Sequence, residues 1–356
     1  VALYDELHAM PKPAWQEFRT TEAVLRRLAG IGLAVRPLPG RTGAVAVWDG
    51  GAASAGGGAA VTAGGAPDGG APPVRRTVAL RADMDALLQT VGGAERANHS
   101  CGHDAHMAMV LSALRCLKEI GWNPPPGGRL IGIFQPAEET GEGARALLGA
   151  GVLDGVDCLL GIHLRPRKEM PFGKASGAIY HGGAAVLSGT IRGRQAHAAR
   201  PEDGINAIEA FAAAALAVKE VAAAAAPGSC KMTTVRSPNA SSNIIPDEVS
   251  FEADIRAATP EALRELCERA RRAVSEAAEA HGASAETRLY IRAMPARPDP
   301  AMERVVGEAI RDVLGDNGLV RPVVTPGGED FHFYAAEKPG LRATMIGLGC
   351  DLAPGL

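Results

Sequence analysis

The chain has 356 residues, enough for two domains that each bury a core of their own. Hydrophobic residues make up 46% of it and charged residues 22%, which is ordinary for a soluble globular protein, and a net charge of −3 argues against nucleic acid as a partner. No apolar run is long enough to cross a membrane, and residues 1–18 lack the charged start, apolar centre and cleavage site of a targeting segment. We therefore expect neither a membrane partner nor a leader sequence.

Cysteine usage bears on the compartment. The six cysteines are scattered along the chain with no framework spacing: Cys101, Cys116, Cys158, Cys230, Cys267 and Cys350. Such a pattern is typical of reduced thiols rather than of a disulfide scaffold. We therefore expect a cytoplasmic protein.

Residues 51–75 consist mainly of Gly, Ala and Pro, a composition that does not form a packed element. They separate two strand patterns, at 42–48 and 77–82. We interpret the segment as a mobile surface loop, an inert insertion in a hairpin-like connection, in preference to a functional role.

Three apolar runs predict buried strands, at 77–82, 129–135 and 158–164. Between the first two, apolar residues recur at spacings of three and four and predict a helix over 105–118, through Met107, Val110, Leu111, Leu114 and Leu117. Strands that alternate with helices indicate a mainly parallel sheet covered on both faces.

Polar side chains cluster where these strands end. Asp83 and Asp85 follow the first strand, Glu138 and Glu139 follow the second, and His163 lies at the end of the third. In open parallel sheets, ligands bind beyond the carboxyl ends of the strands. The sequence therefore predicts that these residues share one edge of the sheet.

From about residue 183 the order becomes strand–helix–strand–strand–helix–strand, which is typical of a ferredoxin-like domain. A helix at 300–315, a Gly-rich turn and a strand at 342–349 follow it. We therefore expect an α/β protein with a mixed, mainly parallel sheet in a discontinuous catalytic domain, residues 1–174 and 294–356. The smaller βαββαβ domain, residues 175–293, is inserted into it.

The sequence Cys-Gly-His-Asp-Ala-His, which begins at Cys101, holds side chains that a transition metal prefers. A loop that enters a helix can aim Cys101 and His103 at one point. A buried thiol and a satisfied histidine would explain this pair alone, but Glu139 and His163 are expected on the same edge. Together these donors outnumber what one ion needs, so we predict a site for two divalent ions. His106, one turn after His103, is expected to support the site rather than to bind metal.

Adjacent Glu138 and Glu139 permit a division of labour. One carboxylate can bind metal while the other accepts a proton from a metal-bound water. Paired glutamates on a loop are usually just solvated, but these follow Phe-Gln-Pro at the end of a buried strand. That position favours the catalytic interpretation.

Seven motifs occur in order across almost the whole chain: ALRADMDAL, SCGHDAH, FQPAEE, GIHL, GRQAHAARP, NIIP and GGEDF. In these motifs the chain resembles the zinc-type amidohydrolases, which include hippurate hydrolase, indoleacetyl-amino-acid hydrolases and bacterial N-acyl-amino-acid deacylases. These are relatives of aminoacylases and carboxypeptidases. The resemblance implies a di-metal catalytic domain with an inserted lid and dimerisation domain.

The resemblance also implies roles for the residues that match its motifs. Cys101 and His103 match the first two metal ligands, with Cys101 bridging both ions. Glu138 matches the general base, and Glu139 and His163 match further ligands. The metal is zinc, or manganese, cobalt or nickel, all of which tolerate this ligand set.

Three residues of the inserted domain match positions that meet the substrate. His197 matches a histidine that helps to polarise the scissile carbonyl, reaching across a dimer in some arrangements. Asn243 and Arg256 match contacts to the carboxylate end of the substrate, for which an arginine fork is suited. For Arg256 the alternative is an ordinary salt bridge on a strand surface.

The chain departs from the family pattern at two places. The last metal ligand of the family is a histidine in a short His-Ser-Pro or His-Pro segment, which has no counterpart before Leu356. It is expected beyond Leu356, or else the second metal position is incomplete; His332 follows the wrong motif to replace it. Leu88 stands where the family has a proline, which is expected to alter the loop beneath the metals.

We therefore predict a metal-dependent amidohydrolase that cleaves the amide bond of N-acyl amino acids or related conjugates with a metal-activated water. A carboxypeptidase or dipeptidase on the same scaffold is the nearest alternative, which an assay of acyl amino acids against dipeptides would separate. A catalytically silent small-ligand binding protein is the other. The resemblance favours a homodimer that forms through the inserted domain.

Overall fold

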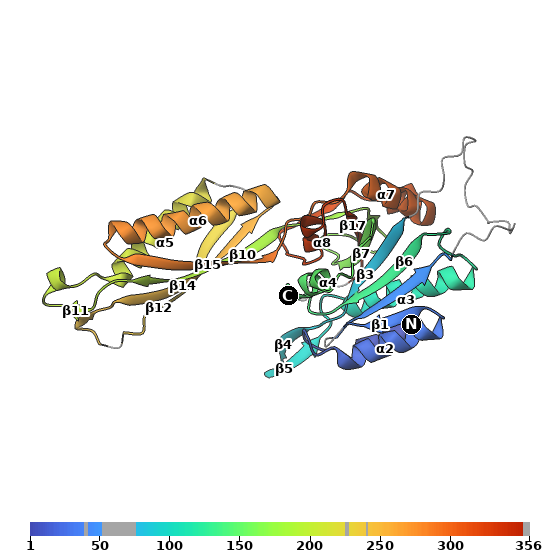
Figure 1. The fold of residues 1–356 in the computed structure, drawn as a ribbon, viewed down its shortest axis with the longest axis horizontal. Coiled ribbons are helices and arrows are strands. Elements are labelled where there is room, and N and C mark those ends of the chain that lie inside the picture. The colour runs from blue at the N-terminus through green and yellow to red at the C-terminus, as the bar shows by residue number, and fades with distance from the viewer. Residues whose placement is uncertain (39–41, 52–75, 225–227, 240, 352–356) are drawn as a thin grey trace. The chain divides into compact units, whose positions relative to one another are not determined.

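The structure is a computed structural model that describes residues 1–38, 42–51, 76–224, 228–239 and 241–351. All but the first residue of the expected loop at 51–75 lies outside these described residues. The chain divides into two compact units (Figure 1). Unit 1 comprises Val1–Ala178, Pro298–Val323 and Glu337–Leu356, and unit 2 comprises Ile179–Arg297 and Val324–Ala336. Residues 324–336 therefore group with unit 2, whereas the sequence places them in the discontinuous domain.

Unit 1 is built on a seven-stranded sheet with the order β1-β2-β6-β3-β7-β17-β8. Its strands are β1 (Ala34–Pro37), β2 (Ala44–Asp49), β3 (Thr77–Asp83), β6 (Arg129–Gln135), β7 (Cys158–Arg165), β8 (Ala175–Ser176) and β17 (Arg342–Gly349). The four central strands β6, β3, β7 and β17 are parallel, and the outer pairings are antiparallel. The prediction of a mixed, mainly parallel sheet is confirmed.

The connection between β2 and β3 is not hairpin-like, contrary to the expectation. β6 lies between the two strands and pairs antiparallel with β2 and parallel with β3. Two strands separated by a third cannot share a hairpin turn. Local sequence did not reveal this, because the residues of β6 that pair with β2 come 80 to 90 positions later in the chain.

Helices cover both faces of the sheet. The helices of unit 1 are α1 (Ala2–His8), α2 (Phe18–Gly30), α3 (His103–Glu119), α4 (Gly143–Gly149) and α7 (Pro300–Leu314). Met107 and Leu114 of α3 pack in one core with Leu130 and Phe134 of β6. Ile133 alternates with Phe134, so it faces the other side of the sheet, where it is buried as well.

Unit 2 contains an antiparallel sheet with the order β12-β14-β10-β15 and two helices on one of its faces (Figure 1). Its elements are β10 (Gly183–Arg192), α5 (Ala207–Ala223), β12 (Ser229–Arg236), β14 (Glu248–Ala257), α6 (Pro260–Ala280) and β15 (Ser284–Ala293). Thr259 caps α6 by accepting from the amide of Ala262, and Pro260 begins the helix. The βαββαβ order expected from the sequence is the order observed.

Short elements complete the described fold. A hairpin of β4 (Leu87–Val91) and β5 (Ala94–Asn98) belongs to unit 1, and a bridge of β11 (Ala196–His197) and β13 (Ile244–Ile245) belongs to unit 2. The remaining elements are the strands β9 (Ile179–His181) and β16 (Val323–Thr325), the helix α8 (His332–Glu337) and two 3₁₀ helices, Pro201–Asp203 and Asp316–Gly318. None of the helices within the described residues has the length and apolar character needed to cross a bilayer.

Candidate metal centre

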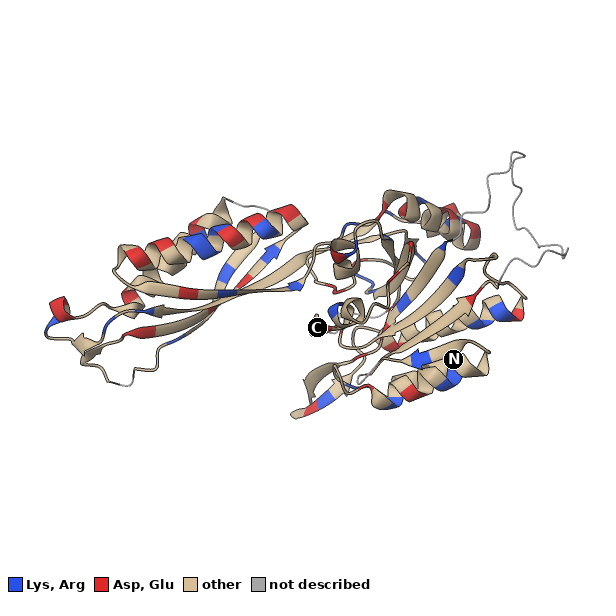
Figure 2. Ribbon diagram, viewed as in Figure 1, with Lys and Arg blue, Asp and Glu red and all other residues tan. Residues whose placement is uncertain are grey.

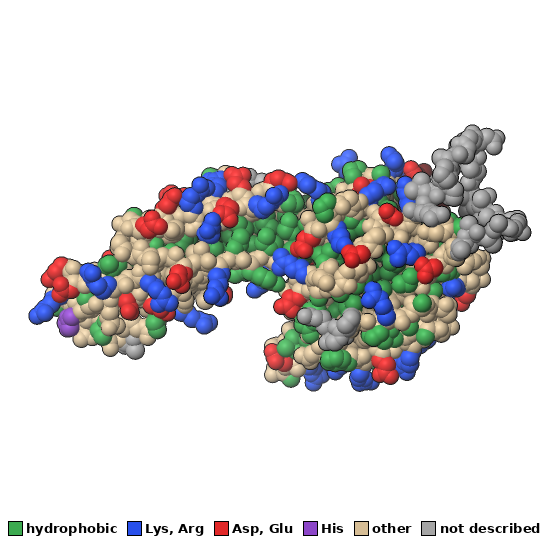
Figure 3. Space-filling view, viewed as in Figure 1, with side chains coloured by type: hydrophobic (Ala, Val, Ile, Leu, Met, Phe, Trp, Pro, Cys, Tyr) green, Lys and Arg blue, Asp and Glu red, His purple; other side chains and the backbone are tan. Residues whose placement is uncertain are grey.

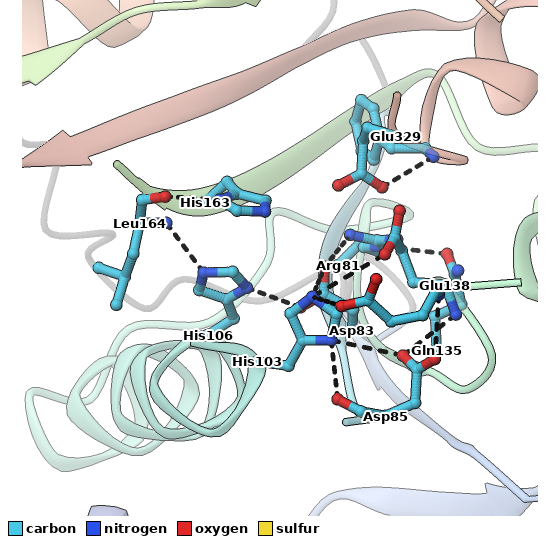
Figure 4. A network of polar contacts seen from close by, with 12 residues as sticks. Arg81, Asp83, Asp85, His103, His106, Gln135, Glu138, His163, Leu164 and Glu329 are labelled. Carbon is cyan, nitrogen blue, oxygen red and sulfur yellow. Dashed lines mark hydrogen bonds and ion pairs between the residues drawn. The ribbon is translucent and has the colours of Figure 1, made fainter. Parts of the chain in front are cut away.

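The polar residues singled out in unit 1 meet at one edge of its sheet. Asp83 is the last residue of β3, Glu138 and Glu139 follow β6 by three and four residues, and His163 lies near the end of β7. These three strands are neighbours and run parallel, so their carboxyl ends share the edge. Figure 4 shows this arrangement with α3 beside it.

The start of α3 brings in Cys101 and His103. Gly102 is the N-cap, with a φ of 80° that favours glycine, and a Cβ there would lie 2.9 Å from the Leu164 side chain. The turn places Cys101 immediately before the helix and makes His103 its first residue. The helix therefore begins two residues earlier than the apolar periodicity predicts, because the periodicity marks only its buried face.

His103 presents one nitrogen without a partner. Its Nδ1 donates to the backbone carbonyl of Asp85 at 2.9 Å, which leaves the Nε2 lone pair as the donor to a metal. The residue is 1% exposed, and its Nε2 has no hydrogen-bond partner. Oε1 of Glu139 is likewise buried without a partner, and it lies 3.8 Å from His103 Nε2. That separation is too long for a hydrogen bond but suits two ligands on opposite sides of one ion.

Cys101 completes this group of donors. One ligand atom each from Cys101, His103 and Glu139 lies within 4.8 Å of the other two. Thiolate, imidazole and carboxylate are the donors that Zn²⁺ takes in proteins. Two buried polar atoms that face each other without a hydrogen bond would be costly unless a cation occupied the space. The residues present therefore fit a divalent ion.

Protonation of these donors opposes metal binding. Burial, with the nearby Glu139 carboxylate, raises the pKa of the Cys101 thiol far above its usual value. Burial disfavours the charged form of His103, but the adjacent Asp83 and Asp85 outweigh it and raise the pKa to about 10. In the metal-free protein at neutral pH, the Cys101 sulfur and the His103 Nε2 therefore each hold a proton, and an incoming ion must displace both.

We accordingly expect metal binding to release about two protons per chain near pH 7–8, so that affinity rises by about a hundredfold per pH unit. The rise should continue while pH stays below the His103 pKa of about 10. Calorimetric titration of the metal-free protein with metal, in buffers of different ionisation enthalpy, measures the number of protons released. The Cys101→Ala variant should release about one proton fewer and hold less metal. A variant that keeps its full metal complement would contradict the ligand role of Cys101.

Asp85 holds the two glutamates in place. Its Oδ1 accepts the Glu138 amide at 3.1 Å and its Oδ2 accepts the Glu139 amide at 3.0 Å, while its own carbonyl accepts from His103. One buried residue therefore orients three members of the site. In the sequence, Asp85 stands out only by its place after a strand, and the one signal of its role is the pair of carboxylates at the end of an apolar run.

Asp83, His103 and His106 also lie close enough together to hold an ion. The polar atoms of Asp83 and His106, however, are already engaged in hydrogen bonds. His106 Nδ1 pairs with Asp83 Oδ1 at 2.6 Å, and His106 Nε2 accepts the Leu164 amide at 2.9 Å. The other oxygen of Asp83 accepts from Arg81 at 2.5 Å. Burial opposes the charge on Asp83, but His103, Arg81 and His106 hold its pKa well below the usual value. This group is a hydrogen-bonded network and not a second metal site.

His163 is partly exposed and lies outside the Cys101 donor group. Its Nδ1 pairs with the carbonyl of Leu164 at 2.6 Å, so the lone pair is on Nε2. Desolvation by burial lowers the pKa of His163 well below its usual value, which keeps the ring neutral. Its ring centroid lies 6.2 Å from that of His103.

The remaining predicted site residues lie in unit 2. His197 is exposed, and its strand β11 pairs with β13, which brings the Asn243 carbonyl to 2.9 Å from the Ala198 amide. Arg256 donates two hydrogen bonds to its neighbour Asp254, at 2.7 and 2.9 Å. That pair is the ordinary salt bridge weighed as the alternative for Arg256. His332 contacts His181, at 3.0 Å between ring nitrogens.

Comparison with known proteins agrees with this geometry. Residues 79–355 match the Peptidase family M20/M25/M40. The chain is 29% identical to IAA-amino acid hydrolase ILR1-like 2 of Arabidopsis thaliana, covering 98% of this chain and 76% of the relative. It is 29% identical to an N-acetyl-L-cysteine deacetylase of Bacillus subtilis, covering 96% and 78%. A Bacillus subtilis structure described as a dinuclear metal binding peptidase of the M20 family has a TM-score of 0.73 and 25% identity, covering 98% and 88%.

The fold and the donors on its sheet edge define a metal-dependent hydrolase of amide or peptide bonds. The chain belongs to the peptidase family M20/M25/M40. The resemblance stated from the seven motifs is thereby confirmed.

Proposed function

We propose that this hydrolase cleaves the amide bond of N-acyl amino acids or related amino-acid conjugates, with two divalent ions bound in unit 1. One observation carries the proposal: the partnerless nitrogen of His103 and oxygen of Glu139, buried beside Cys101 and next to a second glutamate. Support for the substrate class comes from relatives named as an IAA-amino acid hydrolase and an N-acetyl-L-cysteine deacetylase.

Cys101, His103 and Glu139 would hold one ion, and His163 would serve a second, with the Cys101 sulfur shared between them. Asp85 supports this arrangement because it accepts from both glutamate amides and from His103. When bound, the ions would supply Lewis-acid activation of a water molecule and of the scissile carbonyl. Zinc suits the thiolate best, and manganese, cobalt and nickel tolerate the same donors.

Glu138 is proposed as the general base. Its Oε2 lies 3.9 Å from His103 Nε2, and its side chain is 11% exposed. It would take the proton of the attacking water and return it to the leaving nitrogen. Asp85 supports a division of labour between the two glutamates, because it holds both amides while the Glu139 side chain lies near Cys101 and His103.

Three residues of unit 2 are proposed to meet the substrate. His197 would donate to the oxyanion that forms as the carbonyl is attacked. Asn243 and Arg256 would bind the free carboxylate of the amino acid, which for Arg256 means exchanging the Asp254 carboxylate for that of the substrate. The short β11–β13 bridge supports a joint role, since it holds His197 and Asn243 together.

We also propose a homodimer through α5 and β12. β12 is an edge strand, and α5 packs beside it with Ile208 and Leu216 exposed. α6 contrasts with it: Figure 2 marks charged residues of both signs along that helix, and Figure 3 shows charged side chains of both signs over it. An open strand edge beside an apolar helix face invites pairing with another copy, whereas a charged helix does not.

Substituting Leu216, which is 64% exposed, tests this interface. The Leu216→Arg variant should sediment as a monomer, because a charge desolvated at the interface is costly. Val313→Arg is a matched control, since Val313 is 80% exposed on α7 in unit 1. This variant should sediment with the same mass as the parental protein. A Leu216→Arg protein that remains a dimer would exclude this surface.

The six cysteines also support a reducing compartment, and we propose the cytoplasm. All six are free thiols, at Cys101, Cys116, Cys158, Cys230, Cys267 and Cys350. An oxidising environment would favour their pairing or modification, and the proposed role of Cys101 needs a free sulfur.

Hydrolysis assays test the proposed function. Metal-free protein loaded separately with Zn²⁺, Mn²⁺, Co²⁺ or Ni²⁺ is offered N-acetyl, N-benzoyl and indoleacetyl amino acids, and matched dipeptides as controls. We expect cleavage of the acyl amino acids in at least one metal form, with loss of activity on chelation. Faster cleavage of dipeptides would favour the peptidase alternative, and binding without turnover in every metal form would favour a silent binding protein.

A further inference from the structure

A continuous chain of hydrogen bonds links the buried centre of unit 1 to His163. It runs from Arg81 through Asp83 and His106 to the backbone of Leu164 and then to the His163 ring (Figure 4). We propose that His106 is a positioning residue that sets the orientation of His163 through Leu164. The inference rests on the proposed function, in which His163 binds the second ion.

The first step fixes the tautomer of His106. Asp83 is a carboxylate that also accepts from Arg81, so the His106 Nδ1 that faces its other oxygen carries the proton. The His106 Nε2 then holds a lone pair, which accepts the Leu164 amide at 2.9 Å. Both ring nitrogens are therefore used, and His106 is left with no lone pair for a metal.

The second step concerns the strand itself. β7 pairs with β3 only as far as Arg81 opposite Gly161, whereas β17 accompanies β7 to Arg165. After Gly161 the pairing of β7 with β3 ends. The edge of β7 that pairs with β3 up to that residue therefore has no partner in β3 at Leu164. The imidazole of His106 takes the place of that partner for the amide of Leu164, and so holds the end of β7 in its extended course.

The third step reaches the proposed ligand. The Leu164 carbonyl pairs with His163 Nδ1 at 2.6 Å, and the His106 and His163 rings pack with centroids 4.7 Å apart. The His163 ring is thus held by the backbone that His106 anchors and by the ring of His106 itself. Arg81, Asp83 and His106 are each 0% exposed, so water does not compete for these bonds.

Two substitutions of His106 test the proposal. Leucine removes both hydrogen bonds, whereas the glutamine amide offers one donor for Asp83 and one acceptor for the Leu164 amide. Metal affinities are measured by calorimetric titration of Zn²⁺ into metal-free protein. We expect His106→Leu to weaken the second ion by about 10- to 100-fold and to leave the first unchanged. His106→Gln should restore most of the loss.

Other outcomes overturn the proposal. A lower unfolding temperature with both metal affinities unchanged would mean that His106 has only a structural role. X-ray absorption of the zinc-loaded His106→Gln protein counts the bound imidazoles and does not need the leucine variant to fold. An unchanged count is expected, and the loss of one imidazole would mean that His106 is a ligand. If His163→Ala keeps both ions at parental affinity, the assignment of His163 fails instead, which separates the two hypotheses.

Discussion

Replacement of Glu138 by glutamine should lower kcat by about 10²- to 10⁴-fold while both metal affinities stay at parental values, because the change removes only the proton acceptor. Glutamine keeps the length of the side chain and the backbone amide, so the hydrogen bond from residue 138 to Asp85 persists. Steady-state kinetics on an N-acyl amino acid, with metal analysis of the same samples, measures both quantities.

Glu139→Gln is the matched control for this prediction. It changes the neighbouring carboxylate, whose Oε1 is one of the partnerless buried atoms, and should weaken metal binding as well as turnover. A Glu138→Gln protein with near-parental kcat would show that the base is elsewhere. A Glu138→Gln protein that lost metal, with Glu139→Gln retaining it, would show that the two roles are reversed.

The second large effect concerns His197. The His197→Ala variant should bind metal normally and lose about 10²- to 10³-fold in kcat, the usual effect of removing an oxyanion donor. The residue is exposed on β11, so its loss should not disturb the fold. Kinetics combined with metal titration tests both parts of this expectation.

Mixing variants then shows which subunit supplies His197. If it acts across the dimer, equal amounts of His197→Ala and Glu138→Gln chains should recover about a quarter of parental activity after exchange, since half the dimers are mixed and each has one working site. If His197 acts within its own chain, mixing restores nothing. A monomeric protein with full activity would exclude the action across a dimer altogether.

Much of the architecture followed from local patterns. The apolar runs predicted β3, β6 and β7 to within a residue at either end. The alternating strand and helix patterns from about residue 183 predicted α5, α6 and the four strands around them. These elements bury continuous or strictly periodic apolar faces, so the chemical pattern and the local structure coincide. The motif residues Cys101, His103 and Glu139 were likewise found together, because a loop before a helix and the end of a buried strand converge at one sheet edge.

The local patterns did not reveal which strands pair when they lie far apart in the sequence. The place of β6 between β2 and β3 depends on which strands meet in three dimensions. Arg256 was an open alternative in the sequence, since a charged strand residue looks the same whether it binds a substrate or its neighbour Asp254.

By itself, then, the sequence determined the family and the candidate donors that meet at the sheet edge, since these reside in residue type and spacing. Only the tertiary structure decided how those donors are held. Asp85 reaches both glutamate amides, and His106 replaces a strand partner for Leu164, through contacts between residues more than fifty positions apart. Hydrogen bonds between distant residues leave no periodicity in a sequence, because their geometry exists only after the chain has folded.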